Sequence, residues 1–314
     1  MVPINQPVNS PWETTPAPWP EVINQRVVLA LRPLPDETPY VVRTGWAETV
    51  AGYASRNWVE KTVRLRVAQA GDNALRLRLR LQDVRLVKRH QSAFDDLAEL
   101  LAGLYADLVL DASPTGELRG LANHEEIRRT WQRLRQELAR RYPVPSEVVA
   151  ALVAGIDQQL AQPSSLAPSL PLDYLYAALP GCFYQQPFET NSRYARPRAF
   201  PEFFDGLALH FTETLRLAPL EVLTPAAEPP APVLHLTGTL DGTATDVGAV
   251  AARIQATLGT AHAVRPEDLR LTYEATHRFA KNTGWPTAVA LTVRCAYQDM
   301  YDKEYHLTLH QLPA

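Results

Sequence analysis

The chain has 314 residues, of which 46% are hydrophobic and 21% charged, and its formal net charge is −3. These values are typical of a soluble globular protein whose core is large enough to need no disulfide or metal. They exclude a chain-wide positive charge that would attract nucleic acid or anionic lipid. Charge is nevertheless unevenly distributed, because residues 60–90 carry a net +6 and the remainder therefore −9.

Residues 1–22 form a proline-rich segment that contains Trp12 and Trp19. Proline fixes φ and lacks an amide donor, so we expect an extended arm. The two indoles favour an arm that docks on its own body or on a partner, and a disordered tail is the alternative. The segment lacks the basic and apolar regions of a secretory signal, and no stretch of about 18 apolar residues follows. We therefore expect a cytoplasmic protein without a membrane span.

The next residues predict strands, at 26–32 and 38–50, followed by a β-hairpin. Aliphatic residues alternate with arginines at 62–70 and again at 75–81, with Gly71-Asp72-Asn73 as the turn between them. One face should be buried and the other should carry an arginine ladder: Arg64, Arg66, Arg76, Arg78 and Arg80. This ladder predicts either a surface for an anionic partner or a solvated face neutralised by acidic residues. Nucleic acid is not expected, since no aromatic residues interleave with the arginines.

Residues 92–180 predict a helical segment interrupted by a short hairpin. Two strands flank the turn at residues 114–117, and Asn123 then precedes a helix whose apolar stripe includes Trp131. Asn123 is the expected N-cap, with Glu126 completing a capping box. Ser146 is expected to cap a further helix that extends to about residue 162.

Residues 182–204 combine aromatic and basic side chains without a clear period. Tyr, Phe and Arg are enriched at the centres of protein interfaces. We therefore predict Tyr194, Arg196 and Phe200 as anchors for a partner. A loop packed on the chain's own core is the alternative.

The last hundred residues predict mostly antiparallel strands, at 207–217, 234–240, 269–279, 287–297 and 304–312, with one helix at 246–258. A Pro-Ala connector at 224–232 should join two parts of one sheet. The predicted fold class is therefore α+β: a curved antiparallel sheet with the helices of 92–180 packed on its concave face. Residues 23–314 should form a single domain.

No recognised catalytic or nucleotide-binding template is present, so we expect neither an enzyme nor a cofactor. The two cysteines, Cys182 and Cys295, are too few for a disulfide framework and are expected to be buried thiols. The eight histidines lack metal-ligand spacing, so no metal site is expected. Catalysis by Cys182 with His210, or by Glu202 in a carboxylate pair, is a minor alternative.

The stretch LVLDASPTGELRGLANHEEIRRTWQRL, residues 108–134, resembles a pattern found in uncharacterised bacterial proteins, notably from Bacteroidetes. Its marked positions are Gly116, Asn123, Glu126 and Trp131, and the resemblance implies a structure rather than an activity. The chain also resembles lipoprotein-carrier-like half-barrels, in which a curved antiparallel sheet wraps around helices. That resemblance implies a role in carrying lipid, but those proteins are exported.

Together these observations predict a non-enzymatic interaction or assembly protein, an accessory component of a larger bacterial complex, with a protein partner or self-association. The alternative is a half-barrel that binds a small molecule or lipid in a cavity lined by Leu and Val between sheet and helices.

Overall fold

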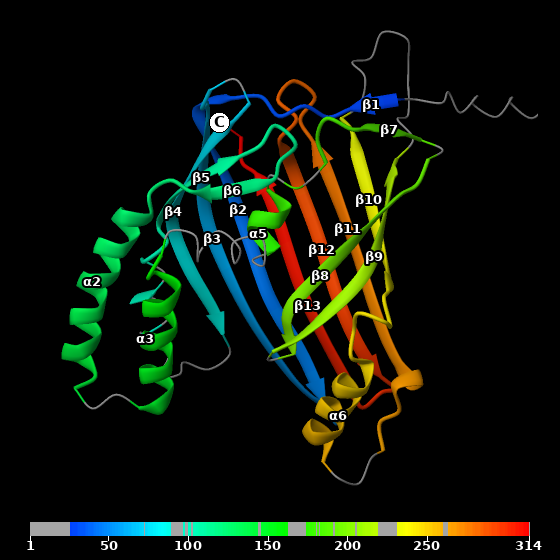
Figure 1. The fold of residues 1–314 in the computed structure, drawn as a ribbon. Helices are drawn as coiled ribbons and strands as arrows, with labels where there is room; N and C mark the ends of the chain where they lie inside the picture. Colours follow the sequence, from blue (N-terminus) through cyan, green and yellow to red (C-terminus); the bar gives the residue numbers. More distant parts are fainter. Residues whose placement is uncertain are drawn as a thin grey trace, which may run out of the picture.

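The fold is dominated by one curved antiparallel sheet of eleven strands (Figure 1). The computed structural model describes residues 26–71, 73–88, 97, 100–101, 103–143, 146–162, 174–179, 181, 183–190, 192–204, 206–218, 231–259 and 263–313. The predicted arm at residues 1–22, with Trp12 and Trp19, lies outside these residues, as does most of the connector at 224–232. The strand before the connector, β9, and the strand after it, β10, are neighbours in the sheet.

The strand order in the large sheet is β6-β5-β4-β3-β2-β13-β12-β11-β10-β9-β8. Its strands are β2 (Leu34–Val50), β3 (Tyr53–Gln69), β4 (Leu75–Lys88), β5 (Asp107–Ala112), β6 (Leu118–Leu121), β8 (Tyr194–Phe204), β9 (Leu207–Leu217), β10 (Val233–Leu240), β11 (Leu269–Phe279), β12 (Pro286–Tyr297) and β13 (Tyr301–Gln311). A second sheet pairs β1 (Arg26–Val28) with β7 (Pro187–Glu189). Among the described residues the helices are α2 (His124–Arg141), α3 (Glu147–Gln159), α5 (Tyr174–Ala178), α6 (Val247–Leu258) and the 3-10 turn η2 (Pro266–Asp268).

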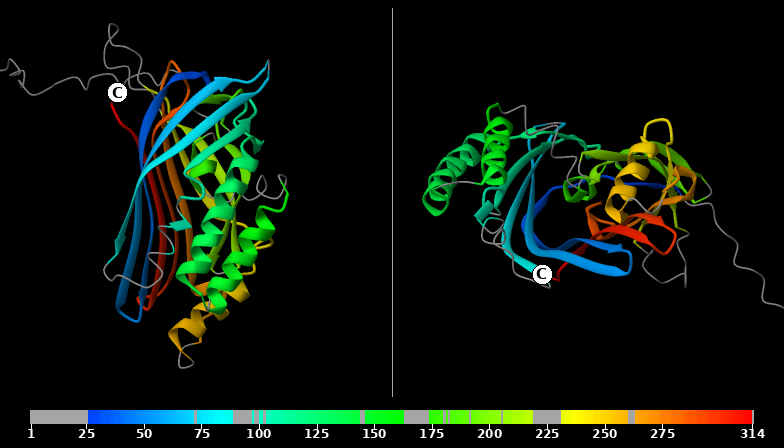
Figure 2. Two further views of the ribbon diagram at one scale, coloured as in Figure 1. Left: turned by 90° about the vertical axis from the view of Figure 1, so that its left-hand side faces the viewer. Right: turned by 90° about the horizontal axis from the view of Figure 1, so that it is seen from below.

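The α+β prediction, with a group of helices packed on the concave face, is wrong. The fold is sheet-dominated, and α2 and α3 lie beside the β4 end of the sheet rather than within its curve (Figures 1 and 2). The two helices pack against each other, and the Trp131 indole donates a 2.8 Å hydrogen bond to Asp157 of α3. The apolar stripe of α2 therefore predicted that one side is buried but not which element buries it.

The short helix α5 does lie on the concave face (Figure 2). The Tyr174 ring lies 5.1 Å from the ring of Phe200 on β8 and 4.5 Å from that of Tyr305 on β13. Leu175 is buried as well. This five-residue helix consequently contacts the edge strand β8 and the central strand β13.

Alternation along the strands assigns aliphatic and aromatic side chains to the concave face and most charges to the convex face. The predicted hairpin is confirmed: β3 pairs with β4 in the register Leu65 to Leu79 and Arg66 to Arg78. Leu65 and Leu77 are fully buried, as the period-two pattern requires.

The two edges of the large sheet are formed by the four-residue strand β6 and by β8. Strand β8 contains Pro197 and Pro201. Proline has no amide hydrogen to give to a ladder, so it is found mainly in edge strands, at strand starts and at bulges.

Candidate functional site

An apolar cavity of about 210 Å³ lies on the concave face, between α5 and strands β3, β4 and β5. Nine of its ten lining side chains are aliphatic or aromatic, and the tenth is a lysine. The lining residues are Val59, Lys61, Val63, Leu79, Leu81, Val84, Tyr105, Leu108, Leu175 and Tyr176. This composition, mostly apolar with one charged group, is typical of a small-molecule site.

A β-bulge in β4 shapes this lining. Val63 pairs with Leu81, whereas the next residue back along β3, Thr62, pairs with Asp83. Gln82 is therefore the extra residue, and its side chain accepts a 2.8 Å hydrogen bond from Arg64. This extra residue shifts the inward–outward alternation of β4 by one position, so that Val84 faces the cavity beside Lys61.

Lys61 is the charged residue of the cavity wall, and its cross-strand neighbours are Val42 on β2 and Val84 on β4. Its side chain is half-buried. None of the residues that the structure describes forms a salt bridge or hydrogen bond with its ammonium group. A lysine on an apolar sheet face either extends to water or binds an anion.

Other cations on the concave face have contacts within the chain. The Lys303 ammonium lies 4.9 Å from the Trp46 ring centre, and the rings of Phe203 and Phe204 are 5.7 and 5.1 Å away. Such cation–π contacts stabilise a partly desolvated ammonium. Arg196 pairs with Glu213 at 2.9 Å.

Glu213 is the centre of a polar cluster within the core. It is fully buried and also accepts a 3.3 Å hydrogen bond from the Tyr273 hydroxyl. Gly238 lies opposite it on β10, and a Cβ there would approach the Tyr273 ring to 2.7 Å. A glycine is needed at this position because Phe211 and Tyr273 close over it.

His277 lies close to this cluster, with its ring 4.7 Å from that of Phe183. Burial lowers the pKa of His277 to about 3, and the positive charges of Arg198 and Arg196 act in the same direction. The imidazole is therefore neutral at physiological pH. Its Nδ1 has no hydrogen-bond partner among the described residues.

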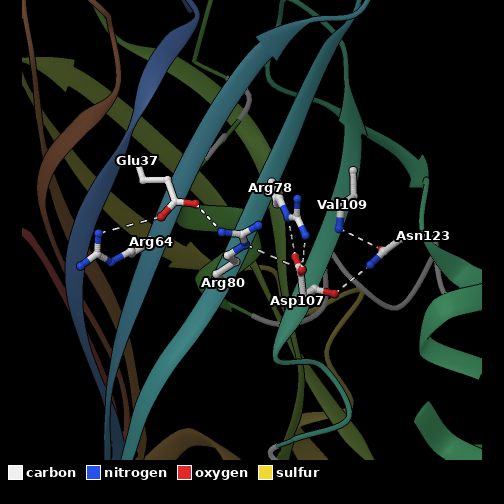
Figure 3. A network of polar contacts seen from close by, with 7 residues as sticks. All are labelled: Glu37, Arg64, Arg78, Arg80, Asp107, Val109 and Asn123. Atoms are coloured by element: carbon white, nitrogen blue, oxygen red, sulfur yellow. Dashed lines mark hydrogen bonds and ion pairs between the residues drawn. The ribbon is translucent and has the colours of Figure 1, made fainter. Parts of the chain in front are cut away.

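The predicted arginine ladder lies on the convex face and is largely neutralised by acidic residues (Figure 3). Arg76 pairs with Asp111 at 3.0 Å, and Arg78 pairs with Asp107. Arg80 pairs with Glu37 at 2.8 Å. This is the arrangement expected for a solvated sheet face, and the role of Arg76, Arg78 and Arg80 in binding a partner stays a prediction.

The three predicted anchors in residues 182–204 all belong to β8. Phe200 is fully buried within the chain, and Arg196 is engaged by Glu213. The Tyr194 ring lies 5.1 Å from that of Phe188. These contacts are intramolecular, so a role for these residues in binding a partner also stays a prediction.

Asn123 stands at the predicted N-cap position, but its side chain does not cap α2. Its Oδ1 accepts a 2.9 Å hydrogen bond from the Val109 amide, and its Nδ2 donates at 2.8 Å to the Asp107 carbonyl (Figure 3). The amide thus extends the pairing of β5. The predicted cap at Ser146 is confirmed, since its hydroxyl accepts from the Val149 amide.

The described residues show no group of three or more metal-ligating side chains. Burial raises the pKa of the Cys295 thiol to about 12, and Cys182 lies outside the described residues. Within the part of the chain that the structure covers, no helix is both long and apolar enough to cross a membrane.

Two larger cavities lie elsewhere on the described residues, and in each of them an arginine is engaged by an acidic residue of the chain. One of about 680 Å³ is lined mainly by charged and polar side chains, and its Arg294 is engaged by Asp302. Another of about 410 Å³ is a mostly apolar groove between α2 and α3, outside the curve of the sheet, and its two charged side chains, Arg135 and Asp157, pair with each other at 3.2 Å. The cavity beneath α5 combines an apolar wall with a single cation, and it is therefore the candidate site.

No family model and no curated protein matches the chain, so the resemblance at residues 108–134 stays a prediction. A solved structure of lipovitellin, described by its lipid–protein interactions, is similar over 88% of this chain and 25% of that chain, at 10% identity and a TM-score of 0.39. The chain thus spans about a quarter of that structure's length. A DUF1329 family protein from Desulfovibrio piger is similar over 88% of this chain and 86% of that chain, at 6% identity and a TM-score of 0.17.

Proposed function

We propose that this chain binds an apolar or amphipathic small molecule, such as a lipid, on the concave face of its sheet, and that it acts by binding rather than by catalysis. The observation that carries the proposal is the cavity beneath α5 with its nine apolar or aromatic lining residues. An apolar group placed there leaves water and gains contact with aliphatic side chains on several sides.

The size of the cavity limits what it holds. Its volume of about 210 Å³ is below the roughly 300–1,000 Å³ of sites for drug-sized molecules. A slender group such as part of an alkyl chain fits this volume, and the rest of the ligand would extend along the concave face.

Titration with decanol, followed by calorimetry, tests the proposal. We expect saturable binding to the wild-type chain and its loss in Val84→Trp, because the larger side chain fills the cavity. Leu312→Trp is the matched control, since Leu312 is 37% exposed near the C-terminal end of β13 and lines no part of the cavity. Circular dichroism verifies that both variants fold.

Equal decanol binding by Val84→Trp and the wild-type chain would refute this site. Native mass spectrometry of the purified chain gives a second test, in which a co-purified apolar molecule is expected from the wild-type chain and not from Val84→Trp.

The predicted role as an accessory component of a larger complex has no support among the described residues. Phe200 is buried, Arg196 pairs with Glu213, and Arg78 pairs with Asp107, so each is engaged within the chain.

A further inference from the structure

We infer that the ligand of this site is an anionic amphiphile, an alkyl chain with a carboxylate or phosphate head, and that Lys61 binds the head. This inference rests on the proposed function and deepens it. It starts from the position of Lys61 in the wall of the apolar cavity, two residues from Val59 and two from Val63. Alternation gives all three side chains the same face of β3.

The sequence pattern makes this lysine unusual. Along the buried face of β3 and β4 the remaining lining residues are Val or Leu. Holding an ammonium group among them costs free energy unless it reaches water or a counter-charge. None of the ten lining residues is acidic, so the wall itself supplies no counter-charge.

A second inward-facing lysine, Lys303, has a different environment. The ammonium group of Lys303 lies close to the rings of Trp46, Phe203 and Phe204, and Glu48 is the register neighbour of Lys303 on β2. Lys303 thus has partners within the chain. Lys61 has no such partner among the described residues, so its charge is available to a bound molecule.

The chemistry of the site selects the class of ligand. The apolar wall takes the alkyl chain, and a compact ammonium group binds a carboxylate or a phosphate as a point charge. A cationic head would be repelled by Lys61, and a neutral head would gain no charge-assisted hydrogen bond.

The experiment compares ligands that share a ten-carbon chain and differ in the head: decanoate, decyl phosphate, decanol and decyltrimethylammonium, at pH 8 by calorimetry. For the wild-type chain we expect decanoate or decyl phosphate to bind about tenfold more tightly than decanol, the scale of one charge-assisted hydrogen bond. Whichever of the two anions binds more tightly identifies the head as a carboxylate or a phosphate.

In Lys61→Met we expect this preference to vanish, with affinity for the anions falling about tenfold and affinity for decanol unchanged. Lys61→Arg should retain the preference. Arg66→Gln is the matched control, because it removes a positive charge from the exposed face of the same strand; it should leave all affinities unchanged.

The outcomes separate the two proposals. If Lys61→Met binds decanoate as tightly as the wild-type chain, the lysine merely extends to water and the inference is wrong, while decanol binding keeps the apolar site. If the wild-type chain binds none of the four compounds, the proposed function fails and the inference fails with it.

Discussion

Arg196 on β8 and Glu213 on β9 face each other directly across the strand pair, with guanidinium Nη2 2.9 Å from carboxylate Oε1. The carboxylate side chain is 1% exposed and the guanidinium side chain 25% exposed. The chain therefore holds an ion pair on the buried face of its sheet, near the edge strand.

Removing Arg196 should destabilise the folded chain. We expect Arg196→Met to lower the free energy of unfolding by about 3 kcal/mol, because it leaves a buried carboxylate without a counter-charge. Urea denaturation measures this. Arg78→Met is the control, since the side chains of Arg78 and Asp107 are both about 40% exposed. This variant should lower the free energy of unfolding by about 1 kcal/mol or less. Arg196→Met combined with Glu213→Gln should be less destabilised than Arg196→Met alone; equal losses for the two single arginine variants would contradict the buried pair.

His277 should make stability depend on pH. Burial lowers the pKa of this group to about 3 in the folded chain, against about 6.5 in the unfolded chain. Between these values the unfolded chain binds the proton and the folded chain does not. The part of the stability that depends on neutral His277 is therefore fully present above about pH 6.5. It falls as the pH drops towards 3, by up to about 1.4 kcal/mol per pH unit.

Urea denaturation at pH 7 and pH 5 measures this slope. His277→Gln, whose amide does not titrate, should flatten it relative to the wild-type chain. An unchanged slope in the variant would show that other groups cause the pH dependence.

A substitution at Asn123 tests whether this residue caps helix α2 or hydrogen-bonds to the backbone of strand β5. Asn123→Asp keeps a good capping residue but cannot donate to the Asp107 carbonyl, so we expect it to lose about 1–3 kcal/mol of stability in thermal or urea denaturation. Ser146→Ala removes a true cap and should cost about 1 kcal/mol. Wild-type stability in Asn123→Asp would mean that Asn123 acts as an ordinary N-cap after all.

Cys295 should be unreactive while the chain is folded. Burial raises the pKa of its thiol to about 12, so the thiolate needed for disulfide exchange is scarce at pH 8. In a Cys182→Ser background, a thiol reagent such as dithionitrobenzoate should label no sulfur in the native chain and one after denaturation. Rapid labelling of the native chain would show that Cys295 is accessible.

Strands with a plain period of two could be predicted closely from the sequence. The bounds Leu207–Leu217 and Leu269–Phe279 were predicted as they occur, because each strand alternates apolar and polar residues. Strand β8 could not be predicted, since Arg196 lies on its buried face beside two prolines. An arginine is stable on that face only because the carboxylate of Glu213 pairs with it. The pairing of β8 with β9 places Glu213 there, and that pairing cannot be read from the sequence of β8.

The candidate site was harder to predict than the strands. Val59 and Val63 face the cavity through the regular alternation of β3, but Val84 reaches it only because a bulge at Gln82 shifts the register of β4. Lys61 could not be singled out from the sequence, because the arginines of the same hairpin give the stronger charge pattern and lie on the opposite face. A signal was present, since a lysine between two valines at i−2 and i+2 departs from the pattern of the buried face.

Pro197 and Pro201 have a consequence for the behaviour of many copies of the chain together. An open sheet ends in strands whose unpaired amides can recruit further strands, the route by which fibrils grow. Two residues without amide hydrogens interrupt that row along β8, and the opposite margin at β6 is only four residues long. The sheet can thus stay open towards a ligand while each copy remains a poor template for the next.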